Sequence, residues 1–214
     1  MQGEERCQQL VDRLLAAERT RKGIPPITDE FADFTTADAY QVQFQLVKAR
    51  LWDRNRVVGK KIGLTSQAMQ NLLGVSEPTF GHLLSGMEVM EGGVVSLGEL
   101  LQPRVEAEIA FLLNRDLAGP GVSVADVLRA TEVVAPSLEI ADSRIREWKI
   151  KVPDSVADNA SGARFVLGGR LTRVSDIDLS LVGLVFKRNG EVLGTAAGAA
   201  VLGHPAAAVA WLVN

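Results

Sequence analysis

The segment Pro103–Phe111, PRVEAEIAF, places two glutamates one residue apart inside an apolar run. Side chains alternate between the two faces of an extended strand, so the apolar residues are expected on one face and Glu106 and Glu108 on the other. Two like charges this close repel, and burial of an unpaired carboxylate is costly. The two glutamates therefore face either water or a partner that carries positive charge.

A third carboxylate has similar surroundings. In VVAPSLEIADSRI, Glu139 lies between Leu138 and Ile140, so on a strand it points opposite to two apolar neighbours. Three carboxylates from two strands, converging in one cavity, would form an oxygen-only site suited to Mg²⁺ or Mn²⁺. The alternative is that all three lie on a solvated sheet face, because glutamates are mostly exposed. The spacing by itself favours the solvated face.

Helical periodicity dominates the first part of the chain. It predicts a helix over residues 5–23, ending at a glycine, and a second helix with Thr36 as its N-cap. A strand is expected over 56–64, followed by a short helix that ends at Gly74.

Strands dominate from Val94 onward. We expect strands around the three glutamates, over 163–167 and over 179–187, with Asn189-Gly190 as a hairpin turn into EVLGTAAG. The capping box Ser123–Asp126 opens one intervening helix. The fold class is therefore α+β, with a helical or mixed N-terminal portion at residues 1–80 and a mainly β portion at residues 81–214.

The last segment, GHPAAAVAWLVN, predicts a helix with Pro205 in its first turn and apolar residues on every side. Such a helix has to be covered, either by another subunit or by further chain. We therefore expect extensive contacts between subunits.

Composition excludes several classes of function. A net charge of -3 and a pI near 5.5 leave no basic surface for nucleic acid or anionic lipid. The single cysteine, Cys7, cannot form an internal disulfide, which suits a reducing compartment. The N-terminus is polar, and no apolar run approaches the roughly 20 residues of a membrane span. These features predict a soluble cytoplasmic protein.

Five segments occur in the order KKIGLTSQAMQNLLGV, PRVEAEIAF, SLEIADSRI, DNASGARFVLGG and GHPAAAVAWL. Together they resemble the 2-hydroxypenta-2,4-dienoate (2-keto-4-pentenoate) hydratases and the related 2-oxo-3-hexenedioate decarboxylases of the fumarylacetoacetase-like superfamily. The resemblance implies a mainly β catalytic domain with a mixed, rolled sheet. It also implies that relatives continue for some tens of residues beyond the apolar helix, so that this chain looks shortened at its C-terminus.

The resemblance also assigns roles to residues. It implies that Glu106, Glu108 and Glu139 bind Mg²⁺ or Mn²⁺ and that Lys61, directly before IGLTS, takes part in catalysis. Lys60 is expected on the opposite, solvated face of the strand. Without the resemblance, a surface lysine on a strand is the preferred interpretation of Lys61.

Two further positions concern the substrate. Ser161 in DNAS is a candidate for holding the substrate carboxylate, and the alternative is a serine that hydrogen-bonds its own loop. Thr79 stands where many relatives have an acid, and a threonine can bind a water but cannot act as an acid or base near neutral pH. His82 lines either the pocket or a polar loop, and His204 reads as a helix cap, so two histidines so placed do not form a zinc site.

The resemblance implies a hydro-lyase that adds water to 2-hydroxypenta-2,4-dienoate and gives 4-hydroxy-2-oxopentanoate in aromatic meta-cleavage catabolism. A 2-oxo-3-hexenedioate (4-oxalocrotonate) decarboxylase and a non-catalytic partner subunit are the alternatives. The expected partners are a small 2-oxo or 2-hydroxydienoic acid, further copies of the chain, and the aldolase of the next pathway step.

Overall fold

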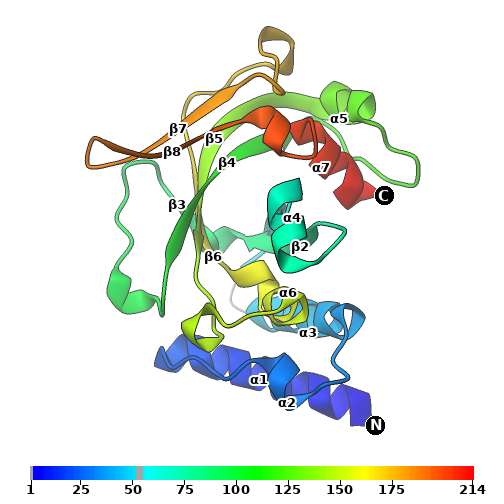
Figure 1. The fold of residues 1–214 in the computed structure, drawn as a ribbon, viewed down its shortest axis with the longest axis vertical. Coiled ribbons are helices and arrows are strands. Elements are labelled where there is room, and N and C mark those ends of the chain that lie inside the picture. Colours follow the sequence, from blue (N-terminus) through cyan, green and yellow to red (C-terminus); the bar gives the residue numbers. More distant parts are fainter. Residues whose placement is uncertain (1, 52–54) are drawn as a thin grey trace. The chain divides into compact units, whose positions relative to one another are not determined.

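A computed structural model describes residues 2–51 and 55–214 (Figure 1). The chain divides into two compact units, each built from three segments. Unit 1 comprises Met1–Lys61, Phe80–Glu106 and Glu139–Phe165, and unit 2 comprises Ile62–Thr79, Ala107–Leu138 and Val166–Asn214. The division into 1–80 and 81–214 made from the sequence stays a prediction.

The helices of unit 1 are α1 (Gln2–Thr20), α2 (Ile27–Glu30), α3 (Thr36–Arg50) and α6 (Val152–Ala157). Helix α3 contacts both α1 and α6, as Figure 1 shows for the blue and yellow-green helices. Their apolar faces form one buried cluster that includes Leu10, Leu14, Ile27, Val42, Leu46, Ile145 and Val156. The helical N-terminal portion is therefore confirmed, whereas α6 is an additional helix that the sequence pattern did not predict.

Two helix boundaries differ from the prediction. The N-cap of α3 is Thr35 and not Thr36, because the Thr35 side chain accepts the backbone N–H of Asp38, and the Asp38 carboxylate accepts the backbone N–H of Thr35. Helix α1 ends at Thr20, since the next residue, Arg21, has a left-handed φ of 55°.

The strands form three sheets. Strands β1 (Val57–Gly63) and β2 (Thr79–Leu84) pair with each other, and a four-stranded sheet has the order β3-β6-β5-β4. Their bounds are Glu88–Val89 for β3, Gly162–Leu167 for β6, Thr131–Ala141 for β5 and Arg104–Leu113 for β4. The predicted α+β class is confirmed. Strand β2, TFGHLL, escaped prediction because it shows no period of two.

The helices of unit 2 are α4 (Gln67–Leu73), α5 (Val124–Ala130) and α7 (Pro205–Val213). The predicted caps are confirmed at Gly74, with a φ of 65°, and at the Ser123–Asp126 capping box. His204 also caps as predicted, because its Nδ1 accepts the backbone N–H of Ala206 at 3.1 Å.

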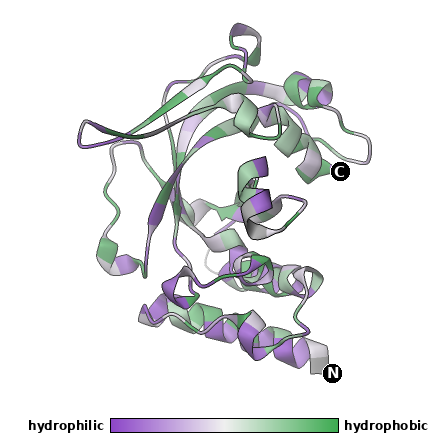
Figure 2. Ribbon diagram, in the orientation of Figure 1, coloured by the Kyte–Doolittle hydropathy of each residue, from purple (hydrophilic) through white to green (hydrophobic). Residues whose placement is uncertain are grey.

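Helix α7 is not left uncovered, contrary to the expectation from its sequence. It is mostly hydrophobic in Figure 2, and it packs on α5 through Val127, Ala206 and Ala210. None of its residues from Pro205 to Val213 is exposed. Among the described residues, no helix is both long and apolar enough to cross a membrane.

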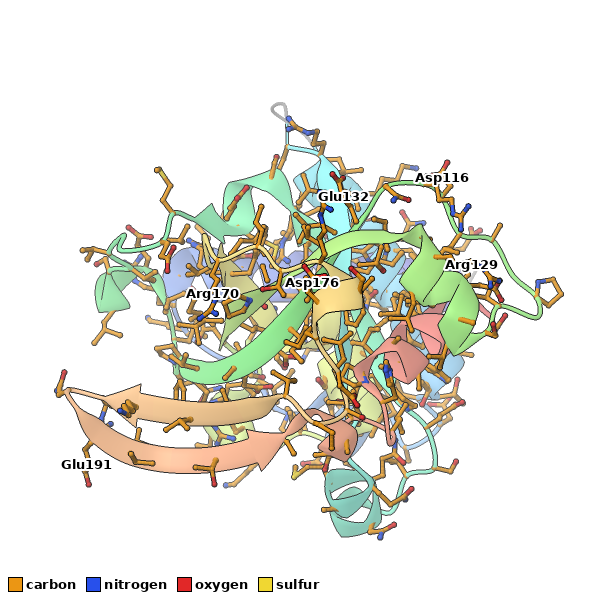
Figure 3. All side chains as sticks on the ribbon, turned by 90° about the horizontal axis from the view of Figure 1, so that it is seen from above. Asp116, Arg129, Glu132, Arg170, Asp176 and Glu191 are labelled. Atoms are coloured by element: carbon orange, nitrogen blue, oxygen red, sulfur yellow. The ribbon has the colours of Figure 1, made fainter. Side chains whose placement is uncertain are left out.

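The last two strands, β7 (Gly183–Arg188) and β8 (Glu191–Ala197), form an antiparallel hairpin. Asn189 and Gly190 turn it with φ values of 52° and 87°, as the Asn-Gly pair predicts. Strand β7 begins four residues later than predicted, because the Asp178 carboxylate accepts the backbone N–H of Ser180 and folds that segment into a turn. Glu191 projects at the turn end of the hairpin (Figure 3).

Candidate functional site

Glu106, Glu108 and Glu139 form one acidic cluster. Each offers a carboxylate oxygen, and these oxygens all lie within 4.8 Å of one another. Glu106 and Glu108 are exposed and come from β4, whereas Glu139 is buried and comes from the neighbouring strand β5. Pairing of β4 with β5 therefore brings together residues that are about 30 positions apart in the sequence.

The exposure of the β4 side chains does not by itself distinguish a metal site from a solvated sheet face. Ala107 and Ile109 are only half-buried, and Val105 on the same side is 48% exposed, as befits a strand at the end of its sheet. Exposure of Glu106 and Glu108 is compatible with either an open site or a solvated face. Their convergence on a buried third carboxylate favours the open site.

Glu139 and Lys61 form an ion pair in which Glu139 is buried and Lys61 is partly buried. Lys61 Nζ donates to Glu139 Oε1, and the side chains are 12% and 8% exposed. Burial raises the pKa of Glu139, and the negative charge of Glu106 raises it further. The Lys61 ammonium opposes this rise. Lys61 is therefore not a surface lysine, and Glu139 is a carboxylate whose charge requires a nearby cation.

Gly162, the first residue of β6, makes room for this ion pair. A Cβ atom at this position would lie 3.3 Å from Lys61 Cδ and 3.5 Å from Glu139 Oε1. A larger side chain would displace one of the two partners, since these distances already amount to full contact.

Lys60 is exposed, as predicted, but its ammonium group makes contacts that were not predicted. Its Nζ lies 3.0 Å from His82 Nε2 and 5.0 Å from the centre of the Phe80 ring. Partial burial lowers the pKa of Lys60. The lysine side chain therefore folds back onto β2 instead of extending into water.

His82 is buried on β2 and its tautomer follows from its partners. The Gln43 amide donates to Phe80 O at 2.9 Å and to Val156 O at 2.8 Å, so its Oε1 is an acceptor for His82 Nδ1 at 3.0 Å. The Nδ1 atom then carries the proton, and Nε2 accepts from Lys60. Burial, with the Lys60 charge second, lowers the pKa of His82 to about 4, so the imidazole is neutral at pH 7.

The two proposed substrate contacts lie in different surroundings. Ser161 is 3% exposed, and its Oγ lies 3.4 Å from Ser155 Oγ. Thr79 begins β2 and is 5% exposed, and its Oγ1 lies close enough to Gly63 to be 3.3 Å from a Cβ built there. Both hydroxyls are thus buried polar groups, and their contact with a substrate stays a prediction.

Sequence reasoning missed two groups beside Lys61. The carbonyl oxygen of Ala160 accepts from Lys61 Nζ at 2.7 Å, and Asn159, fully buried, hydrogen-bonds the backbone of His82. A backbone carbonyl is present in every residue, so no sequence signal could identify the first. Asn159 was not among the predicted residues, although asparagine is one of the few residues that tolerate a left-handed conformation.

The donor set of the acidic cluster fits a hard divalent cation. It offers three carboxylate oxygens with no cysteine or histidine among its members, and these are the ligands that Mg²⁺ and Mn²⁺ prefer. The two exposed glutamates leave an approach from solvent, and the buried one supplies a charge that is costly without a cation.

Known proteins resemble the chain along nearly its whole length, although no protein-family model matches it. A 2-hydroxypent-2,4-dienoate hydratase of Pseudomonas putida is 48% identical over 207 residues, which is 96% of this chain and 93% of that protein. A 4-oxalocrotonate decarboxylase of Pseudomonas sp. (strain CF600) is 44% identical over 205 residues, 96% of this chain and 78% of that protein.

The fold of the chain also matches a solved structure. The 4-oxalocrotonate decarboxylase from Pseudomonas putida G7, complexed with magnesium and adipate, superposes with a TM-score of 0.93 at 41% identity, over 99% of this chain and 80% of that one. With this agreement in sequence and in fold, the chain belongs to the family of the 2-keto-4-pentenoate hydratases and 4-oxalocrotonate decarboxylases.

Proposed function

We propose that the protein is a Mg²⁺- or Mn²⁺-dependent hydro-lyase that adds water to 2-hydroxypenta-2,4-dienoate and gives 4-hydroxy-2-oxopentanoate in aromatic meta-cleavage catabolism. The observation that carries the proposal is the convergence of Glu106, Glu108 and Glu139 beside the partly buried Lys61 ammonium. Two hydratases at 48% identity, those of Pseudomonas putida and Comamonas testosteroni, support it over the decarboxylase at 44%.

We assign the three glutamates to the metal. When bound, the cation supplies Lewis-acid polarisation of the carboxylate and keto oxygens of a 2-oxo acid. Glu106 and Glu108 from β4 and buried Glu139 from β5 would hold the cation. This division leaves the solvent side of the cluster to the substrate.

We assign Lys61 to proton transfer or to pairing with the substrate carboxylate. An ammonium carries three N–H groups, of which Glu139 and the Ala160 carbonyl accept two. The third is the one that we assign to the substrate. Ser161 is proposed to hold the substrate carboxylate, and the Thr79 hydroxyl is proposed to orient the attacking water.

The second candidate is decarboxylation of 2-oxo-3-hexenedioate. It is favoured by the likeness to the solved decarboxylase, whose TM-score is 0.93. The same three carboxylates would serve both reactions, because each reaction passes through the enolate of a 2-oxo acid. The third candidate is a non-catalytic partner subunit. Thr79 favours it, because this residue stands where many relatives have an acid.

The first prediction separates these functions. With Mg²⁺ or Mn²⁺ the protein is expected to consume 2-hydroxypenta-2,4-dienoate and to yield 4-hydroxy-2-oxopentanoate, followed by absorbance and by mass spectrometry. Treatment with EDTA should abolish turnover, and added Mn²⁺ should restore it. Faster release of carbon dioxide from 2-oxo-3-hexenedioate would replace the hydratase with the decarboxylase. Bound Mn²⁺ without turnover of either substrate would indicate the non-catalytic subunit.

We also propose that the protein is a cytoplasmic homo-oligomer that works beside the aldolase of the next step. The single cysteine suits a reducing compartment. A 4-hydroxy-2-oxo acid is the type of compound that a retro-aldol reaction cleaves. Support for self-association comes from the apolar side chains that the β7-β8 hairpin exposes, Val185 at 56%, Val192 at 52% and Leu193 at 46%.

The second prediction concerns this assembly. Light scattering coupled to size exclusion is expected to give a mass of at least two chains at micromolar concentration. Val192→Lys should shift the distribution toward the monomer, because a charge replaces an exposed apolar contact. A stable monomer for the unmodified chain would contradict the proposed oligomer.

A further inference from the structure

Three consecutive residues that are not glycine adopt left-handed backbone angles in the short turn η4, Asn159–Ser161. Their φ values are 55°, 48° and 56°. Such angles bring the Cβ atom too close to the backbone, and they persist only where the surroundings hold them in place. Three such residues in one turn therefore indicate that neighbouring groups hold this turn in place.

The Asn159 side chain ties the turn to β2. Its Oδ1 accepts the backbone N–H of His82 at 2.8 Å, and its Nδ2 donates to the His82 carbonyl at 2.9 Å. Asn159 is fully buried, so water does not compete for these bonds. The Asn159 amide thus binds both backbone groups of His82, as a paired strand would, and this holds the turn against β2.

The rest of the turn is held from two other directions. The backbone N–H of Asp142, after β5, donates to Ser161 O at 2.7 Å. The buried Arg144 guanidinium donates to Asp158 O at 2.7 Å, directly before the turn.

Close approach to β2 depends on Gly81. A Cβ atom at Gly81 would lie 2.7 Å from the Asn159 carbonyl oxygen and 3.2 Å from Ala160 Cβ. The first distance is shorter than real Cβ contacts, so any side chain at position 81 would push the turn away from the strand.

The turn presents the Ala160 carbonyl to Lys61. It accepts from Lys61 Nζ at 2.7 Å, while Glu139 binds the same ammonium from β5. A lysine side chain has four rotatable bonds, and a single partner leaves it free to pivot about that partner. Two acceptors from different segments fix the position of Nζ.

We propose that the Asn159–Ser161 turn sets the position of the Lys61 ammonium and that Asn159 is the positioning residue that holds it. The proposal rests on the function proposed above, because the consequence for turnover requires a catalytic Lys61. Asn159 itself touches neither substrate nor metal in this account. It acts through the Ala160 carbonyl.

Two variants loosen the turn by different routes. Asn159→Gly removes both bonds to His82, and glycine accepts the positive φ without strain. Gly81→Ala keeps Asn159 but displaces its carbonyl. The matched control is Gly59→Ala on β1, where the new Cβ would lie 3.6 Å from its nearest neighbour, an ordinary contact. Lys61→Met serves as the reference for loss of the ammonium.

The first readout uses metal-free protein and needs no activity. Limited acetylation with acetic anhydride is followed by peptide mass spectrometry, with the exposed Lys187 as internal standard. Acetylation of Lys61 relative to Lys187 is expected to rise about tenfold or more in both turn variants, and to stay unchanged in Gly59→Ala. The second readout is steady-state turnover, in which kcat should fall about tenfold or more in both turn variants and stay unchanged in Gly59→Ala, because misplaced groups lose rate.

A turn that is only structural would give the opposite pattern. Folded Asn159→Gly and Gly81→Ala, checked by thermal unfolding, would then keep the acetylation ratio and kcat of the unmodified protein, and this result would overturn the proposal. Full turnover by Lys61→Met would instead refute the catalytic role of Lys61, and the acetylation ratio alone would then decide whether the turn positions it.

Discussion

Replacing Glu106 with glutamine is expected to weaken Mn²⁺ binding by about 100-fold or more. Loss of a residue that only hydrogen-bonds a metal ligand already lowers metal affinity by about 10–100-fold. Glutamine keeps the shape of the side chain and removes one of three negative charges whose oxygens lie within 4.8 Å. Titration calorimetry with Mn²⁺ measures the affinity, and turnover at limiting Mn²⁺ should fall in parallel.

The matched control is Glu132→Gln. Glu132 is an exposed glutamate on β5, seven residues before Glu139 and about 23 Å away along an extended strand (Figure 3). This variant should bind Mn²⁺ as the unmodified protein does. Because Glu106 is exposed, its replacement should change the free energy of unfolding by only about ±0.5 kcal/mol. Near-normal turnover of Glu106→Gln at limiting Mn²⁺ would falsify the metal assignment.

Arg144→Met is expected to lower the free energy of unfolding by about 3–5 kcal/mol, because it leaves a buried carboxylate without its cation. Arg144 and Asp158 are 1% and 0% exposed, and the Arg144 guanidinium Nε donates to Asp158 Oδ1 at 2.5 Å. Burial alone would lower the pKa of Arg144, but the Asp158 and Glu18 carboxylates raise it. Urea unfolding at pH 7 measures the change.

An exposed ion pair provides the comparison for Arg144. Arg129 and Asp126 pair on α5 with side chains 64% and 37% exposed, and Figure 3 labels Arg129 on this helix. Arg129→Met should leave the free energy of unfolding almost unchanged, since solvent screens such pairs. The double variant Arg144→Met, Asp158→Asn should recover part of the loss, because the unpaired charge is gone. A loss below about 1 kcal/mol in Arg144→Met would show that the buried pair is not needed for stability.

The comparison with known proteins agrees with the family that the five sequence segments indicated. Those segments lie in different parts of the fold, so the resemblance did not depend on knowing how they meet. Distinguishing the hydratase from the decarboxylase is a different problem. It depends on the far end of a substrate pocket, and no residue of the sequence could be assigned to that end.

The features that could be predicted from the sequence are those that depend on neighbours along the chain. The capping box at Ser123, the left-handed cap at Gly74 and the Asn189-Gly190 turn each use hydrogen bonds or backbone angles within about four residues. Alternation in PRVEAEIAF likewise predicted β4. These signals are local, so the rest of the fold does not alter them.

The convergence of the three glutamates could not be predicted from their spacing and required the folded structure. Their spacing favoured a solvated sheet, whereas pairing of β4 with β5 brings them together, and β1 brings Lys61 to Glu139. The Ala160 carbonyl reaches Lys61 only because Asn159 ties a strained turn to β2. Charge repulsion, burial and hydrogen bonding depend on distances in space, and strand pairing sets those distances between residues far apart in the sequence.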